Sequence, residues 1–508
     1  SIYLEEADSL RIQIKLRAAS KGQLFLYRNE VFFMENTSIP NHILVMKYGG
    51  SSVGSPVAMK SAVKIICETK KEYPNLVVVT SAISGATDAL IKSATDASSG
   101  NLTTAEKTAH ELTARHQELI DKLVEDPKIW LQLKMDVNRL ISEFVNLCNA
   151  IKILGELSPR ALDAVSSLGE RLSVRILSAA VESAGIKSKP VESTQLIITD
   201  DVYQSASPDM ELTSVRCKKV LYPILNEGIT PIVTGFIGAT KEGSITTLGR
   251  GGSDYSASII AVGLEAEEVW IWTDVTGVMS ADPRIVPDAK TIPALTYNEV
   301  SEMAYYGAKV LHPKSVKPCV ENGIKMRICN TFAPQSQGTI LIHNNDAVDV
   351  GKIKAVTTAS GFKLITVSGA GMDSGMNASA KIFNGFVEAG VNVPMVIESS
   401  SEQSLCFPID IKKVNKVEKV LRTILEKEIS RKDIDEFEIS EPVDILTVIC
   451  SGLKSHPEVI TQVLSKLIEN QYKIKALSYG ASDVSLNIIV SSSDSISALK
   501  AIHQLISF

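Results

Sequence analysis

The strongest constraint on the fold is a series of short apolar runs that each end in glycine, serine or threonine. They occur at 43–54, 75–88, 228–238 and 267–278, and segments with helical periodicity lie between them. Strands that are apolar on both faces belong to a parallel sheet that helices cover on both sides. Such sheets bind ligands at the carboxyl ends of their strands, where these polar turns would lie. We therefore expect an α/β fold with its functional site at that edge of the sheet.

A long helical segment separates the second run from the third. Residues 103–153 contain few helix breakers, and Asp126-Pro127 divides them into two helices. Thr103-Thr104-Ala105-Glu106 is typical of a helix N-cap. We expect a helical hairpin that packs over the sheet, with a dimerisation surface as the alternative role.

The C-terminal third of the chain contains one module twice. Ile365-Thr366-Val367 matches Leu446-Thr447-Val448, and the apolar pattern of 382–387 recurs at 463–468 with the same offset of 81 residues. Both copies predict the order strand, helix, strand, strand, helix. One more strand would turn each copy into a ferredoxin-like βαββαβ unit.

The two copies differ in how that last strand is supplied. Residues 434–449 offer one to the first copy, whereas the last helix of the second copy, about 494–506, runs almost to the final residue. An unpaired sheet edge would favour aggregation. We therefore predict that 352–358, which precedes the first copy, completes the second and nests one module's chain inside the other.

Amino-acid composition argues against binding to nucleic acid, association with a membrane and a cysteine-based metal site. The chain is 44% hydrophobic and 22% charged, as globular proteins are, and its net charge of −6 disfavours binding to nucleic acid or to an anionic membrane. No apolar stretch approaches the roughly 20 residues that span a bilayer. The seven cysteines form no C-x-x-C pair, so we expect reduced thiols and no metal site.

Two glycine-rich clusters follow predicted strands. In Lys47-Tyr48-Gly49-Gly50-Ser51-Ser52, backbone N–H groups could approach phosphate oxygens beside the lysine charge, but the cluster is neither a Walker A loop nor a dinucleotide turn. A plain turn with a solvated lysine is the alternative. Gly249-Arg250-Gly251-Gly252-Ser253-Asp254 precedes a helix and favours an anion site in which Arg250 grips a carboxylate.

Two further clusters add cations. Asp274 ends a strand where ribose, adenine or a metal could lie, and Arg284 could reach phosphates, although Asp-Pro-Arg is usually a turn. Lys309 adds positive charge, whereas His312-Pro313 is more typical of a turn. We find no nucleophile–base pair. Glycine turns with several cations and few bases are typical of phosphoryl transfer.

The ordered set of motifs resembles the aspartate kinases of the amino-acid kinase family. The motifs are KYGGSSV, SAISGATD, GERLS, TGFIG, TTLGRGGSDYSA, WTDVTGVMSADPR and YYGAKVLHP. The two C-terminal modules are similar to the paired ACT domains of these enzymes. The resemblance implies an amino-acid kinase fold, with a mostly parallel sheet covered by helices on both faces, followed by two ferredoxin-like ACT domains. The implied divisions are an N-terminal extension (1–42), a catalytic domain (43–345), a linker (346–361), and ACT domains at 362–441 and 442–508.

The reaction implied by the resemblance is transfer of the ATP γ-phosphoryl group to the β-carboxylate of L-aspartate. It gives 4-phospho-L-aspartate, the first step toward lysine, threonine, methionine and isoleucine. A carboxylate is already ionised near neutral pH, so no base is needed. Mg²⁺ would arrive with ATP, since no carboxylate cage is visible. Another amino-acid kinase, such as a glutamate 5-kinase or acetylglutamate kinase, and a non-catalytic amino-acid sensor are the alternatives.

The resemblance also assigns site residues. Lys47 would stabilise the transferring phosphoryl group, and Asp254 would organise Lys47 and the substrate. The implied ATP-binding residues are Lys47, Gly49, Gly50, Ser51, Thr273, Asp274, Met279, Arg284 and Lys309. The implied aspartate-binding residues are Ser81, Thr87, Glu170, Phe236, Arg250 and Ser253. Glu170 would take the substrate ammonium and Arg250 its α-carboxylate. Met279 stands where the family often has an aromatic residue.

Regulation is likewise implied by the resemblance. Lysine would inhibit through the ACT domains, S-adenosylmethionine is a candidate second effector, and a homodimer would form through the ACT domains. The implied effector-site residues are Met372, Asp373, Ser374, Gly375, Asn392, Val393, Pro394 and Ser399. Pro394 stands where many family members have an acidic residue. We expect the second ACT domain to be structural and dimerising.

Two features of the chain ends add expectations. No further Rossmann-like domain follows the second module, which favours the monofunctional, lysine-sensitive type of aspartate kinase. The long helical hairpin, the N-terminal extension and the initial Ser1 resemble the mature plant enzyme. This implies the chloroplast stroma after removal of a transit peptide, with the cytoplasm as the alternative.

Overall fold

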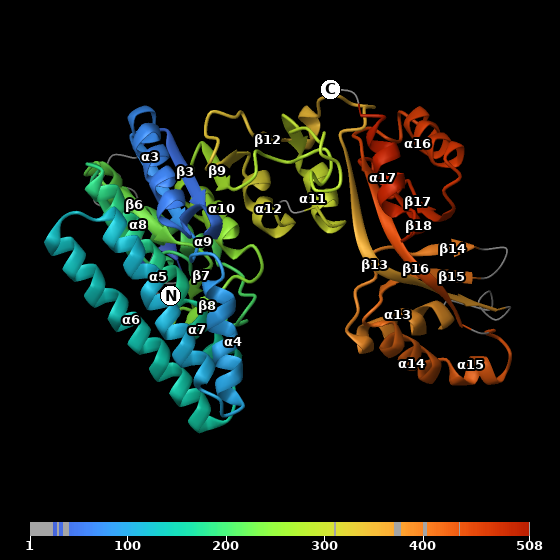
Figure 1. Ribbon diagram of the computed structural model, residues 1–508, viewed down its shortest axis with the longest axis horizontal. Coiled ribbons are helices and arrows are strands. Elements are labelled where there is room, and N and C mark those ends of the chain that lie inside the picture. Colours follow the sequence, from blue (N-terminus) through green and yellow to red (C-terminus); the bar gives the residue numbers. More distant parts are fainter. Residues whose placement is uncertain are drawn as a thin grey trace, which may run out of the picture. The chain divides into compact units, whose positions relative to one another are not determined.

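The computed structural model describes residues 24–27, 30–33, 40–308, 311–369, 377–399, 404–435 and 437–506 (Figure 1). The chain divides into two compact units. The first is Ser1–Thr276 with Lys314–Ile340, and the second is Gly277–Pro313 with Leu341–Phe508. Among the described residues, none of the helices combines the length and apolar character that crossing a bilayer requires.

A parallel sheet forms the centre of the first unit. The strands of this sheet that belong to the first unit have the order β12-β11-β9-β3-β4-β6-β5. The strands are β3 (Ile43–Tyr48), β4 (Asn75–Thr80), β5 (Ser188–Val191), β6 (Thr230–Thr234), β9 (Glu268–Thr273), β11 (Lys325–Asn330) and β12 (Thr339–Ile342). From β11 to β5 every neighbouring pair is parallel, and β3 is buried along its whole length. The predicted α/β fold class is confirmed.

Small antiparallel pairs accompany this sheet. β7 (Ile237–Ala239) pairs with β8 (Ile245–Thr247), and β1 (Leu24–Tyr27) pairs with β2 (Glu30–Phe33). Because β7 and β8 bracket a tight turn, they bring Phe236 and the Gly249–Asp254 cluster to the same end of the unit.

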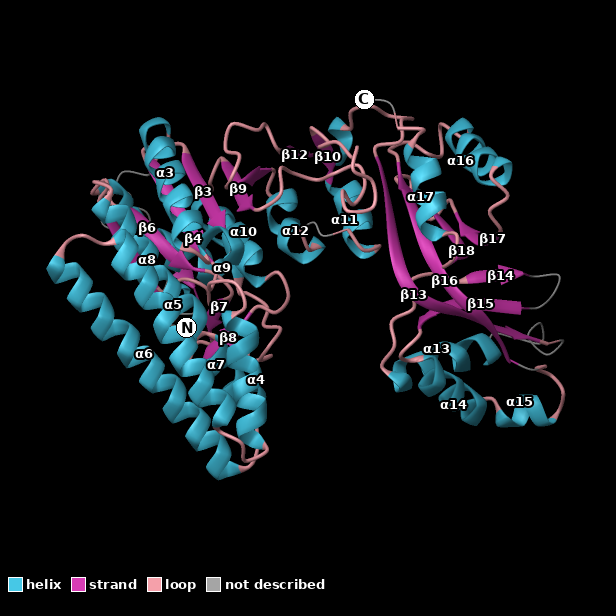
Figure 2. Ribbon diagram, in the orientation of Figure 1, coloured by secondary structure: helices cyan, strands magenta, loops and turns pink. Residues whose placement is uncertain are grey.

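Helices cover the sheet of the first unit (Figure 2). They are α2 (Gly50–Val53), α3 (Pro56–Glu72), α4 (Ala86–Ser98), α5 (Thr103–Leu123), α6 (Pro127–Leu154), α7 (Pro159–Ser166), α8 (Leu168–Ser183), α9 (Met210–Asn226), α10 (Gly252–Leu264) and α12 (Pro313–Glu321), with a 3₁₀ turn η1 (Ser193–Gln195).

The predicted helical hairpin is α5 and α6. Asp126 caps α6 by accepting hydrogen bonds from the N–H groups of Lys128 and Ile129, and Pro127 takes the first helical position. The predicted N-cap within Thr103–Glu106 is wrong. Leu102 precedes the helix without a side-chain cap, and the Asn101 side chain instead accepts from the Thr103 N–H. The hairpin packs on α4 and α8, and α8 in turn packs on β4, β5 and β6 of the sheet.

The second unit contains a six-stranded antiparallel sheet of order β14-β15-β13-β16-β18-β17. Its strands are β13 (Ala355–Ser368), β14 (Ile397–Ser399), β15 (Ser404–Asp410), β16 (Phe437–Ile449), β17 (Ile474–Ser478) and β18 (Ser485–Ser491). Its helices are α13 (Asn377–Ala389), α14 (Val414–Ile424), α15 (Glu426–Ser430), α16 (Glu458–Glu469) and α17 (Ser495–His503). β10 (Ala294–Thr296), α11 (Tyr297–Tyr305) and η2 (Asn344–Asp346) precede them.

Both repeats share the two long strands β13 and β16 (Figure 2). The first half of β13, which contains most of 352–358, pairs with the second half of β16, from Ala355 opposite Ile449 to Ala359 opposite Ile445. After an irregularity between Ala359 and Phe362, the second half pairs with β15 and with the first half of β16. Each repeat keeps its own apolar core, and a third, smaller cluster includes Leu364, Val443, Ile445 and Ile489 of the same sheet.

Candidate active site

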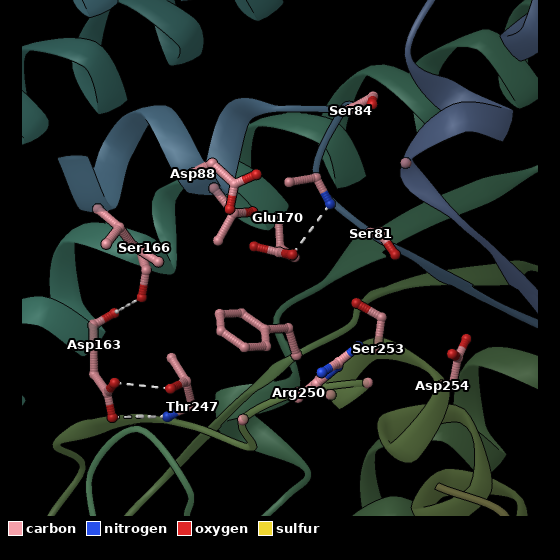
Figure 3. Close-up of a pocket in the computed structure, with 18 of the residues that line it drawn as sticks. Ser81, Ser84, Asp88, Asp163, Ser166, Glu170, Thr247, Arg250, Ser253 and Asp254 are labelled. Atoms are coloured by element: carbon pink, nitrogen blue, oxygen red, sulfur yellow. Dashed lines mark hydrogen bonds between the residues drawn. The ribbon is translucent and has the colours of Figure 1, made fainter. Parts of the chain in front are cut away.

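A cavity of about 560 Å³ lies where β3 and β4 end, in the first unit (Figure 3). Sequence-predicted residues contribute much of its lining. They are Lys47, Gly50, Ser81, Thr87, Glu170, Phe236, Arg250, Ser253 and Asp254. These residues are distant in sequence, but parallel strands end at the same edge of a sheet, which brings them together.

A lysine–aspartate ion pair forms one wall of the cavity. Lys47 near the end of β3 and Asp254 in the first turn of α10 approach to 2.5 Å between Nζ and Oδ1. Their side chains are only 10% and 18% exposed, so each charge depends on the other. The turn after β3 requires glycine at position 50, because a Cβ on Gly50 would lie 2.8 Å from the Ala82 carbonyl oxygen.

Glu170, in the first turn of α8, places a carboxyl group inside the cavity (Figure 3). Its Oε1 accepts a hydrogen bond of 3.2 Å from the Ala82 N–H, while its buried Oε2 has no hydrogen-bond partner among the described residues. Burial raises the pKa of Glu170 to about 8, although the Ala82 N–H and the Lys47 charge act in the opposite direction. A buried carboxyl with a free oxygen suits a cationic ligand group.

Arg250 lies in a tight turn before α10. The glycines on both sides, Gly249 and Gly251, have φ of +78° and +71°, where residues with a Cβ are strained. Gly252 allows close packing, since a Cβ there would lie 2.6 Å from the Phe236 ring. The Arg250 side chain is exposed and lines the cavity, and within the described chain it has no hydrogen-bond or ion-pair partner. Such a guanidinium suits an anionic ligand group.

The other predicted nucleotide residues fall into three groups. Gly49 and Ser51 follow β3. Thr273 ends the adjacent β9 and Asp274 follows it, and the Gly49 N–H donates to the Trp272 carbonyl at 3.1 Å. Met279 and Arg284 belong to the second unit. Arg284 pairs there with Asp282, which forms the turn expected of Asp-Pro-Arg. Lys309 lies outside the described residues.

The predicted effector residues belong to the second unit. The Asn392 amide donates to the Tyr305 hydroxyl at 3.4 Å, and the Tyr306 hydroxyl donates to the Pro394 carbonyl at 3.1 Å. Val393 packs against the core of the first repeat. Ser399 ends β14 opposite Ser404. The remaining four, Met372, Asp373, Ser374 and Gly375, lie outside the described residues.

Several cavity residues are not among those predicted from the sequence. The lining also includes Ser84, Asp88, Asp163, Ser166, Gln204 and Thr247. Ser84 and Asp88 stand within SAISGATD and could have been chosen with Ser81. Asp163 stands in an ordinary amphipathic helix, and Gln204 in an irregular loop, so only the folded chain places them in the cavity.

Comparison with known proteins agrees with this architecture. The model of the amino acid kinase family matches residues 42–330, and an ACT domain model matches 365–425 and 446–505. Aspartokinase 1, chloroplastic, of Arabidopsis thaliana is 30% identical over 91% of this chain and 79% of its own length. Bifunctional aspartokinase/homoserine dehydrogenase 2, chloroplastic, of the same plant is 32% identical over 90% of this chain. The chain spans about half the length of that bifunctional relative, 50%.

Solved structures of Escherichia coli aspartokinase III share the fold. The form in complex with aspartate and ADP has a TM-score of 0.74 at 26% identity and covers 91% of this chain and 99% of its own. The form in complex with lysine and aspartate has a TM-score of 0.73 at 27% identity and covers 92% and 100%. The chain therefore belongs to the amino acid kinase family and, within it, to the aspartokinases that carry ACT domains.

Proposed function

We propose that this chain transfers the γ-phosphoryl group of ATP to the β-carboxylate of L-aspartate and forms 4-phospho-L-aspartate. The observation that carries the proposal is a pair of complementary groups in one cavity. Within the described chain, Glu170 has a buried oxygen without a partner and Arg250 has a guanidinium without one. An α-amino acid offers an ammonium and a carboxylate to these two groups. E. coli aspartokinase III, which shares the fold, was solved with aspartate and ADP.

In this mechanism the cavity orients the amino acid. Glu170 binds the substrate ammonium and Arg250 the α-carboxylate. The remaining aspartate contacts are Ser81, Thr87, Phe236 and Ser253. The β-carboxylate then points toward Lys47, whose charge reduces the repulsion between the two anions, while Asp254 holds Lys47 in place. No general base is needed, because the carboxylate is already ionised.

The nucleotide belongs at the neighbouring strand ends. The proposed ATP contacts are Lys47, Gly49, Gly50, Ser51, Thr273, Asp274, Met279, Arg284 and Lys309. The described residues contain no group of three or more His, Cys, Asp or Glu side chains that could hold a metal ion. Mg²⁺ would therefore be held mainly by the ATP phosphates, where it would neutralise charge.

We also propose inhibition by lysine through the first ACT domain, since E. coli aspartokinase III was solved with lysine. Asn392 and Pro394 contact the consecutive Tyr305 and Tyr306 at the end of α11. A lysine-induced shift of the turn that contains Asn392 and Pro394 would therefore displace the end of α11. The proposed effector site consists of Met372, Asp373, Ser374, Gly375, Asn392, Val393, Pro394 and Ser399. S-adenosylmethionine is the proposed second effector, and the ACT domains are the proposed homodimer contact. The proposed location is the plastid, as for the chloroplastic relatives.

The decisive experiment measures ADP release with aspartate, glutamate or N-acetylglutamate as acceptor. We expect turnover with aspartate and at least about tenfold lower kcat/KM with the others. If Glu170 and Arg250 fix the ammonium and the α-carboxylate, the side-chain carboxylate of glutamate extends one methylene too far, and N-acetylglutamate lacks the ammonium. Lysine should reduce the aspartate rate, and threonine serves as the comparison effector. Absence of aspartate-dependent turnover, or a higher kcat/KM for another acceptor, would refute the proposed substrate.

The pKa of Glu170 ties aspartate binding to pH. Burial raises it from 4.5 to about 8, and only the ionised carboxylate can pair with the substrate ammonium. We therefore expect kcat/KM for aspartate to rise as the pH increases toward about 8 and to level off above it. Glu170→Gln should abolish this rise and lower kcat/KM at least about tenfold. Glu182→Gln, exposed on the same helix, is the matched control. A wild-type profile that is flat across this range would contradict the role of Glu170.

A further inference from the structure

Asp163 in α7 is a buried carboxylate of the cavity that the proposed mechanism does not use. It is 1% exposed, and both its oxygens are occupied. Oδ1 accepts from the Thr247 hydroxyl at 2.8 Å, and Oδ2 accepts from the Thr247 N–H at 2.9 Å (Figure 3). The Gln204 N–H donates to the same carboxylate, at 3.0 Å from Oδ2 and 3.2 Å from Oδ1.

These bonds join two loops that contact each other. The first runs from Thr247 to α10, and the second is the loop before α9 that contains Gln204. Thr247 ends β8, three residues before Arg250. Gly249, between them, passes so close to the second loop that a Cβ would lie 3.0 Å from the Gln204 carbonyl oxygen. Gln204 has a φ of +69°, a left-handed conformation that is rare outside glycine. Asp163 thus anchors both loops, including a backbone conformation that local preferences do not supply.

Other hydrogen bonds also hold the turn that carries Arg250. The Gly252 N–H donates to the Gly249 carbonyl, the Tyr255 N–H to the Gly251 carbonyl, and the Ala206 N–H to the Thr247 carbonyl, each at 2.9 Å. The Leu248 N–H donates to the Phe236 carbonyl at 2.9 Å, and the Ser315 hydroxyl donates to the Gly251 carbonyl at 3.1 Å. Gly249 and Gly251 permit a wide range of backbone angles on both sides of Arg250. The direction of the Arg250 guanidinium therefore depends on the position of the end of β8. Thr247 is held there by its pairing with Ile237 of β7 and, through both its N–H and its hydroxyl, by the Asp163 carboxylate.

We propose that Asp163 is a positioning residue for Arg250 and thereby for the α-carboxylate of the amino-acid substrate. The inference rests on the proposed function. A carboxylate is required at this place because all three donor groups point at it, and an amide would turn an NH₂ group toward one of them. A small misplacement of a substrate-binding group can reduce the rate strongly, so the effect should appear in aspartate binding and not in ATP binding.

The first test removes one bond at a time. Thr247→Val keeps the shape of the side chain but loses the donor to Asp163, whereas Thr247→Ser keeps it. We expect Thr247→Val to raise KM for aspartate about fivefold or more and to change KM for ATP less than about twofold. Thr247→Ser should stay near wild type. Equal rises in both KM values, or the same loss in Thr247→Ser, would reduce Asp163 to a general stabilising role.

The second test asks whether Asp163 acts through Arg250. Asp163→Asn should lower kcat/KM for aspartate about thirtyfold in the wild-type background but about twofold or less in an Arg250→Ala background, because the group it positions is then absent. Equal losses in both backgrounds would overturn the inference. Thermal unfolding identifies variants that fail to fold, and Thr247→Val then carries the test. A wild-type chain without aspartate turnover would refute the proposed function and the inference with it, whereas an active wild type with unaffected variants would refute only the inference.

Discussion

Lys47→Met should lower kcat by about a thousandfold while the protein stays folded. The Nζ of Lys47 lies in the cavity, 2.5 Å from Asp254 and beside the turn of Gly49 and Gly50. In phosphoryl transfer, catalysis comes mainly from positioned positive charge, and removing one such group typically costs a factor of about 10² to 10³ or more. Methionine retains an unbranched side chain that is one atom shorter and has no charge. Steady-state ADP release at saturating aspartate and ATP measures the loss.

The matched control for this change is Lys60→Met. Lys60 is exposed on α3, and its replacement should leave kcat within about twofold. Because Lys47→Met also leaves Asp254 without its ion-pair partner, thermal unfolding should show some destabilisation, which Asp254→Asn in the same chain should partly relieve. If Lys47→Met retained more than about a tenth of wild-type kcat, Lys47 would not be the residue that stabilises the transferring group.

Arg250→Gln should lower kcat/KM for aspartate by about a hundredfold and leave KM for ATP nearly unchanged. A bidentate guanidinium–carboxylate contact in a partly enclosed site is worth roughly 2–3 kcal/mol. Arg250→Lys should recover only part of this loss, since an ammonium cannot make both bonds in the same plane. The measurement is initial rate against aspartate concentration at fixed, saturating ATP.

Two controls separate this effect from a change in overall charge. Arg216→Gln removes an exposed arginine from α9 and should leave kcat/KM near wild type. β-Alanine, which is aspartate without its α-carboxylate, should inhibit the wild type and Arg250→Gln equally well. If inhibition by β-alanine weakened in step with aspartate turnover, Arg250 would act on some group other than the α-carboxylate.

The sequence was sufficient for those features that depend on a local pattern and a general rule. The apolar runs of β3, β4 and β9 predict buried parallel strands, and the strand-end rule then places Lys47 and Ser81 at one edge although they come from separate segments. Glycines at left-handed positions, such as Gly249, appear in the sequence because few other residues tolerate that backbone.

Features that depend on contacts between distant segments could not be predicted in the same way. Asp163 looks like any polar residue on an amphipathic helix until two loops meet beneath it. The start of α5 at Thr103 agrees with the predicted helical segment, but its cap does not, because the Asn101 side chain, which precedes the helix, accepts from the Thr103 N–H. The repeat revealed two modules but not their common sheet, since the register between β13 and β16 leaves no periodic signal within either copy.

That common sheet constrains how the gene can be divided. The strand that closes the second ACT module lies upstream of the first module, so no single contiguous fragment encodes the second module without also encoding the first. A truncation after residue 441 would remove the strand segment that covers Val356, and a fragment beginning at residue 442 would lack Val356 itself. An expression fragment or a domain exchange that keeps the second module folded must therefore include both modules, from β13 to the last helix.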